Sequence, residues 1–240
     1  MFEEFANTFS EQMLSLSKGK LYCLPYSRAL LDFFEARGIA ATPLVVRGVV
    51  FGRLEPTTSW QKLDIPKMAK AAINGPRANA GMVVEYMPED GTELKKLTVP
   101  YRTIGLPHSE GEGDKTLGNY QDGAWLGHLV VVADNTVIDL TIGQLNDKTF
   151  GINFNPPYVT VEADDKFLAG KSLLIGEQDG MIVCYFSFPN ERTYEASDSW
   201  KKPELRQQLK NVADRVVKLF EGRQPSGELR VQEKLLESQA

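Results

Sequence analysis

Three side chains of this sequence have the types that thiol catalysis requires: Cys23, His128 and Asp139. A cysteine attacks a carbonyl group as the thiolate, and a histidine can form an ion pair with it and later protonate the leaving group. A carboxylate behind the histidine fixes the orientation and tautomer of the ring. Cys23 is therefore a candidate nucleophile, His128 a candidate general base and acid, and Asp139 a candidate orienting residue.

The histidine and the aspartate lie near the two outer ends of a predicted β-hairpin, residues 127–141. Two apolar runs rich in β-branched residues flank Asp134-Asn135, a pair that tolerates the left-handed backbone of a tight turn. Antiparallel pairing brings the ends of a hairpin together. We therefore expect His128 and Asp139 to lie within side-chain reach on neighbouring strands.

Cys23 lies at or just before the start of a predicted helix. Pro25 is favoured in a first helical turn, and apolar residues at helical spacing continue from there to Gly38. A helix N-terminus favours the thiolate because of its partial positive charge and free N–H groups. The backbone N–H of Cys23, with Gln12 or Tyr22, is a candidate oxyanion hole.

Each of these residues also has a structural interpretation. A lone cysteine is most often a small buried hydrophobe, and Cys184 in the apolar run 181–186 fits that description. A histidine in a strand is more often a hydrogen-bonded structural residue than a catalyst, and Asp139 could cap the turn that follows it. His108, in a glycine-rich acidic loop, is expected to be solvated. Gln144, shortly after Asp139, is a further candidate for lining the site.

Composition restricts the classes of function. The chain has 240 residues, 42% of them hydrophobic, enough for a packed core. Its net charge is −5 and basic residues form no long run, which argues against nucleic-acid binding. Apolar stretches are too short to span a membrane, and the acidic N-terminus is unlike a secretory signal, so we expect a soluble cytoplasmic protein. Two cysteines without a CxxC pair, and two histidines, favour neither a metal nor an organic cofactor.

The remaining periodicity predicts a mixed fold. Predicted helices cover 2–17, 23–38, about 66–74 and 203–222, with a helical turn at 164–168; predicted strands cover 39–51 and 158–161, and predicted hairpins 81–99, 127–141 and 173–188. Helices at both ends around antiparallel hairpins predict one α+β domain over residues 1–222. A charged tail, residues 223–240, follows it. The glycine-rich segment 105–123 is predicted to be a lid over the site.

Two segments resemble transglutaminase-like proteins, a superfamily related to arylamine N-acetyltransferases and, more distantly, to papain-like peptidases. The first contains Cys23, Ala29-Leu30-Leu31, Arg37-Gly38-Ile39-Ala40-Ala41 and Val45-Val46-Arg47-Gly48; the second contains Gly127-His128-Leu129-Val130-Val131-Val132 and Val137-Ile138-Asp139-Leu140-Thr141. The chain order Cys, His, Asp also matches. The resemblance implies a papain-like or transglutaminase-like α+β fold, in which an N-terminal cysteine helix packs on an antiparallel β-sheet. It also implies a Cys-His-Asp triad and an insertion around residues 55–120.

These observations favour a cysteine-dependent hydrolase, an amidase, peptidase or deamidase that forms an acyl-enzyme on Cys23 and acts on a peptide, protein or small acyl substrate. Acyl transfer of the transglutaminase type shares the first chemical step and remains an alternative. The other alternative is a non-catalytic binding protein that retains the fold and contacts a protein partner through its C-terminal helix and tail.

Overall fold

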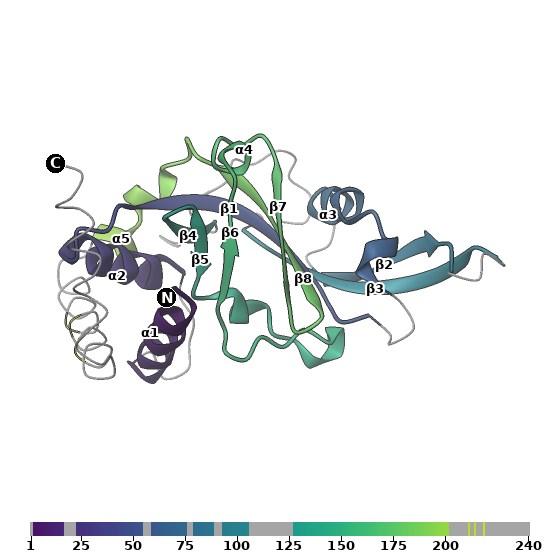
Figure 1. Ribbon diagram of the computed structural model, residues 1–240, viewed down its shortest axis with the longest axis horizontal. Coiled ribbons are helices and arrows are strands. Elements are labelled where there is room, and N and C mark those ends of the chain that lie inside the picture. Colours follow the sequence, from purple (N-terminus) through teal and green to yellow (C-terminus); the bar gives the residue numbers. More distant parts are fainter. Residues whose placement is uncertain are drawn as a thin grey trace, which may run out of the picture.

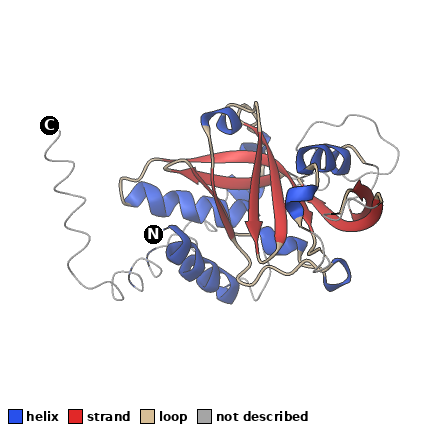
Figure 2. Cartoon of the chain, turned by 45° about the vertical axis from the view of Figure 1, so that its right-hand side comes forward, coloured by secondary structure: helices blue, strands red, loops and turns tan. Residues whose placement is uncertain are grey.

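A computed structural model describes residues 2–16, 23–54, 59–75, 79–88, 93–105 and 127–201, together with residues 211, 214 and 218. The fold is mixed α and β, with one curled antiparallel sheet and a few helices on its outside (Figures 1 and 2). The α+β class expected from the sequence is therefore observed.

The sheet is built around one long central strand. Its strands are β1 (Ala41–Phe51), β2 (Asn79–Tyr86), β3 (Lys95–Ile104), β4 (His128–Ala133), β5 (Thr136–Asp139), β6 (Val159–Glu162), β7 (Leu173–Gln178) and β8 (Met181–Phe188). They follow the order β2-β3-β1-β4-β5-β6, while β8 pairs with the other edge of β1 and β7 pairs with β8. The first half of β1 pairs with β4 as far as Val46 opposite His128, and its second half pairs with β3 from Gly48 onward.

The sheet curls until β6 and β7 approach each other. No backbone ladder joins these two strands in the described part of the chain, yet Gly176 of β7 packs against the side chain of Val161 of β6. The curl encloses an apolar interior built mainly from alternate residues of the strands, among them Val46, Val130, Val132, Val137, Val159, Val183 and Tyr185. Residues pointing the other way from the same strands face the helices, because side chains alternate along a strand.

Two helices cover the outer face of β4 and β5. Helix α1 (Phe2–Leu16) contacts α2 (Cys23–Ala36) through the edge-to-face rings of Phe9 and Phe33. Helix α2 packs its apolar face against the outward side chains of the two strands, including Val131 and Ile138. Figure 1 shows α2 next to β4 and β5. The N-terminal cysteine helix therefore lies on the antiparallel sheet.

The other helices are shorter. Helix α3 (Ile65–Ile73) begins one residue before the predicted start at about residue 66. Asp64 is its N-cap, and Oδ1 of Asp64 accepts from the backbone N–H of Lys67 at 3.1 Å. Helices α4 (Asp165–Leu168) and α5 (Asp198–Lys201) have one turn each. The 3₁₀ turns within the described residues are η1 (Trp60–Lys62), η2 (Ile142–Leu145), η3 (Lys148–Phe150) and η4 (Thr193–Ala196).

Several predictions concern residues at or beyond the limits of the described ranges. Within the segment expected to be an insertion, β2 and β3 are strands of the main sheet. The helix expected at 203–222 is described only at residues 211, 214 and 218, all helical. The proposed lid lies outside the described residues apart from Gly105, and so does the tail 223–240. No described helix is both long and apolar enough to cross a membrane.

Candidate active site

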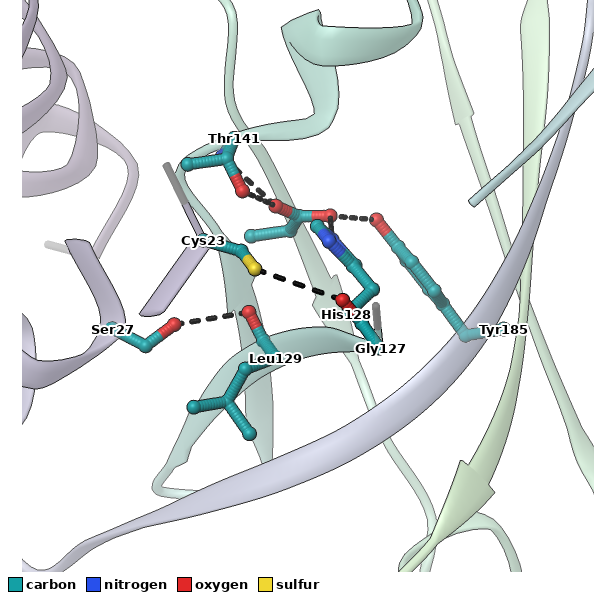
Figure 3. Close-up of polar contacts among 8 residues, drawn as sticks. Cys23, Ser27, Gly127, His128, Leu129, Thr141 and Tyr185 are labelled. Carbon is teal, nitrogen blue, oxygen red and sulfur yellow. Dashed lines mark hydrogen bonds and ion pairs between the residues drawn. The ribbon is translucent and has the colours of Figure 1, made fainter. Parts of the chain in front are cut away.

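Helix α2 contacts the start of β4 at two points, which are four residues apart on the helix and two residues apart on the strand. The Cys23 thiol donates to the carbonyl oxygen of Gly127 at 3.8 Å, and the Ser27 hydroxyl donates to that of Leu129 at 2.9 Å (Figure 3). Four helical residues advance by about 6 Å, and two strand residues advance by about 6.6 Å. The two contacts therefore repeat along both elements and fix the first turn of α2 beside the start of β4.

The Cys23 side chain lies beside an apolar cluster on the outer face of the sheet. This cluster consists of Leu24, Val45, Leu129 and Tyr194, with Phe188 packed against it. His128 points to the opposite, interior face, because it bonds Asp139 and has the same strand parity as Val130. Cys23 nevertheless lies within electrostatic range of His128. His128 is the first residue of β4, and the thiol bonds to the carbonyl oxygen of Gly127, the residue just before it.

The buried Asp139 carboxylate accepts four hydrogen bonds. His128 Nε2 lies 2.7 Å from Oδ2, and the Tyr185 hydroxyl donates to the same oxygen at 2.7 Å. The other oxygen, Oδ1, accepts from Thr141 through the backbone N–H at 2.8 Å and the hydroxyl at 3.2 Å. Figure 3 shows His128, Thr141 and Tyr185 converging from separate segments. With both oxygens used, the carboxylate is held in one orientation.

The charges of this pair are coupled. Burial disfavours the charged imidazole, but the nearby Asp139 carboxylate and its hydrogen bond, with a further contribution from Cys23, raise the pKa of His128 to about 10. Burial likewise opposes ionisation of Asp139, yet the charge and hydrogen bond of His128, together with Tyr185 and Thr141, lower the pKa of that carboxyl below 3.8. At neutral pH the geometry therefore favours an imidazolium beside a carboxylate.

The second ring nitrogen of the histidine is the one available to the thiol. With Nε2 bound to Asp139, Nδ1 is buried and has no hydrogen-bond partner among the described residues. Cys23 contributes to the raised pKa of His128, so the thiol lies within interaction range of the ring. A proton can therefore be exchanged between Sγ and Nδ1, with Asp139 on the far side of the imidazole.

Gly105, at the end of β3, packs closely against His128 and the central strand. Its φ of +77° lies in the left-handed region, and a Cβ at this position would lie 2.5 Å from the Val46 carbonyl oxygen and 3.1 Å from His128 Cβ. Any side chain here would therefore displace the histidine or the central strand. Gly105 and Gly127 border residues 106–126, which are not described.

The structure brings Cys23, His128 and Asp139 together but not every other candidate. Gln12 is half-buried on α1, and no hydrogen bond to Cys23 or His128 is found for it in the described part of the chain. The backbone N–H of Gln144 bonds to the carbonyl oxygen of Thr141 at 2.9 Å, and Thr141 is the residue that donates to Asp139. Tyr22 and His108 lie outside the described residues.

One residue of the site, Tyr185, was not identified from the sequence. Thr141 belongs to the predicted segment Asp139-Leu140-Thr141, and its bond to Asp139 had a local signal, because an aspartate commonly accepts from the backbone N–H two positions later. The alternative that Asp139 caps the following turn is therefore observed as well, alongside its bond to His128. Tyr185 had no signal beyond its place in an apolar strand.

No group of three or more histidine, cysteine, aspartate or glutamate side chains within the described ranges could hold a metal ion. Comparison of the chain with protein-family models, with curated proteins and with solved structures finds no match.

Proposed function

We propose that this protein is a cysteine-dependent hydrolase with a transglutaminase-like or papain-like fold, which forms an acyl-enzyme on Cys23. One observation carries the proposal. His128 and Asp139 form a buried pair joined at 2.7 Å, Nδ1 of the histidine has no partner among the described residues, and a half-buried thiol lies nearby at the start of a helix. The cysteine helix on an antiparallel sheet supports the fold assignment.

A purely structural role explains this pair less well. Removing two charges from water costs several kcal/mol per ion, and an apolar pair of similar volume is often at least as stable. The pair lies beside a large apolar cluster of the sheet interior, whose packing does not require a charge. The turn that Asp139 caps by accepting from Thr141 explains why an aspartate is present. It does not explain why a histidine lies between the carboxylate and a thiol. Perturbed titratable groups of this kind cluster at functional sites.

The reaction follows from the positions of the three side chains. The Cys23 thiolate forms a bond to the carbonyl carbon of an amide, ester or thioester, and the carbonyl electrons move to oxygen. The backbone N–H of Cys23, which has no partner within α2 because it lies in the first turn, can donate to an oxyanion there. The bond to the leaving group then breaks as His128 Nδ1–H protonates that group. Water attacks the resulting thioester and gives its proton to Nδ1, which regenerates the thiolate–imidazolium pair and releases the acid.

The nature of the second nucleophile separates hydrolysis from acyl transfer. Water gives hydrolysis or deamidation, whereas a primary amine gives a new amide through the same acyl-enzyme. We favour hydrolysis of an amide in a peptide or protein, with small acyl substrates as further candidates. Both cysteines are unpaired, which suits a reducing compartment such as the cytoplasm.

Acylation of Cys23 tests the proposal directly. The native protein is mixed with p-nitrophenyl acetate, with an acetyl thioester and with a glutamine peptide, quenched in acid and mapped by mass spectrometry. We expect an acyl group on Cys23 that hydroxylamine removes, as it removes a thioester but not a lysine amide. Methylamine added before the quench reports transfer by forming the N-methylamide.

Two variants control this experiment. Cys184→Ala keeps the candidate site and should be acylated like the native protein, whereas Cys23→Ala should not be acylated at a cysteine. If Cys23 in the folded protein forms no adduct with any of the three reagents, the hydrolase proposal is wrong. The non-catalytic binding protein would then be the better interpretation. Its suggested contact elements, the C-terminal helix and tail, lie almost wholly outside the described residues.

A further inference from the structure

We infer that Tyr185 is a positioning residue of this site, whose hydroxyl holds the Asp139 carboxylate in the orientation that serves His128. The inference deepens the proposed function and rests on it for its catalytic meaning. Its geometric basis is the 2.7 Å bond from the Tyr185 hydroxyl to Oδ2, the oxygen that His128 also uses.

Tyr185 reaches Asp139 across the interior of the curled sheet. Its strand, β8, is separated from β5 in the sheet order by β1 and β4, so no backbone ladder places the two residues together. The side chain is completely buried. It faces Gly48 in the β1–β8 pairing, and a Cβ on that glycine would lie 3.3 Å from the Tyr185 ring. The absence of a side chain at residue 48 leaves the ring the room that it occupies.

The Tyr185 phenol keeps its proton at neutral pH and therefore acts as a hydrogen-bond donor. Burial and the neighbouring Asp139 carboxylate raise the pKa of Tyr185 well above its ordinary value, so the hydroxyl keeps its proton. A phenol has one proton to donate, and here it goes to Oδ2. Thr141 donates twice to Oδ1. Rotation of the carboxylate would break bonds at both oxygens, so Oδ2 stays directed at Nε2 of His128.

The same bond also protects the ion pair against acid. A hydrogen bond to the ionised carboxylate favours that form, so its removal raises the pKa of Asp139. In Tyr185→Phe the carboxylate should therefore take up a proton at a pH about one unit higher than in the native protein. A tyrosine that merely fills space in the core would leave this titration where it is.

The measurement is the NMR signal of the His128 Nε2–H proton, recorded as the pH is lowered over the range in which circular dichroism shows folded protein. His108 is the only other histidine of the chain, and a His108→Gln background removes its signals. Tyr101→Phe is the matched control, because Tyr101 is also buried but belongs to the separate cluster around α3. As the pH is lowered, we expect Tyr185→Phe to lose the signal of the paired histidine at a pH about one unit higher than the native protein does. Tyr101→Phe should lose it at the same pH as the native protein.

The inference would be overturned by a folded Tyr185→Phe variant that loses the His128 Nε2–H signal at the same pH as the native protein. Should that variant fail to fold, the native protein still provides a test: both donors share Oδ2, so a nuclear Overhauser effect must join the Tyr185 hydroxyl proton to the His128 Nε2–H proton. Absence of that effect while both protons are visible rejects the contact. Neither readout uses Cys23, so a protein that forms no acyl-enzyme but shows both effects would disprove the hydrolase and keep the positioning role.

Discussion

The two cysteines of this protein have the same side chain and opposite surroundings. Cys184 is completely buried in β8 and packs in the cluster around α3, where burial raises the pKa of its thiol to about 12. Cys23 is half-buried at the first residue of α2, with a carbonyl oxygen and the His128 ring nearby. The two thiols therefore differ in the features that control cysteine reactivity: position at a helix start, a neighbouring partner and exposure.

The contrast also depends on strand parity. Cys184 and Tyr185 are neighbours in the chain but point to opposite faces of the sheet. Tyr185 therefore reaches the Asp139 carboxylate, whereas the cysteine before it is enclosed among apolar side chains. A shift of β8 by one residue would exchange these two environments.

The largest expected effect comes from removing the histidine. In the native protein iodoacetamide at pH 6 should modify Cys23 at least about 1,000-fold faster than Cys184. In His128→Gln we expect the rate at Cys23 to fall about 100-fold, because the imidazolium partner of the thiolate is lost. Peptide mapping by mass spectrometry measures both rates in one sample, with Cys184 as internal reference. An unchanged Cys23 rate would remove His128 from the site.

Removing the charge behind the histidine should have a smaller effect on reactivity. We expect Asp139→Asn to lower the alkylation rate of Cys23 at pH 6 about tenfold, because the imidazole loses its orienting carboxylate. Breaking a buried pair should also reduce the free energy of unfolding by about 3 kcal/mol. Urea denaturation measures the second quantity. Equal stability and reactivity in the variant would contradict the pair that the structure shows.

The pair should also impose a pH dependence on stability. The folded-state pKa of His128, about 10, is above its ordinary 6.5, so its contribution is complete below pH 6.5 and declines as the pH rises toward 10. The folded-state pKa of Asp139 lies below its ordinary 3.8, so its contribution is complete above pH 3.8 and declines as the pH falls further. The two shifts describe one interaction, so their contributions are not added. Urea denaturation should find maximal stability between these limits, and His128→Gln should lack the alkaline decline.

The smallest effect on the site is expected from Cys184→Ala. The lost sulfur leaves a small cavity that should reduce the free energy of unfolding by about 1 kcal/mol. The Cys23 alkylation rate should stay within about twofold of the native value, because Cys184 lies on the other face of the sheet from the His128–Asp139 pair. A large fall in that rate would mean that the two cysteines are coupled, and Cys184 could not then serve as the internal reference.

Local patterns determined the parts of the site that depend on neighbours in the chain. The turn at Asp134 and Asn135, both with positive φ, joins β4 to β5 as expected, and this hairpin alone brings His128 beside Asp139. Pro25 in the first turn likewise marked the start of the cysteine helix. These features follow from side-chain alternation and turn chemistry over a dozen residues or fewer, so the sequence by itself was sufficient for them.

Only the tertiary structure decided which distant residues complete the site. Cys23 meets His128 because Ser27 and Cys23 bond along β4 in matched steps, a packing relation that no local pattern encodes. Tyr185 meets Asp139 because the sheet curls and turns β8 toward β5 across its interior. The physical reason is that curl is the sum of small twists over all the strands, so it is a property of the whole sheet and cannot be read from any one segment.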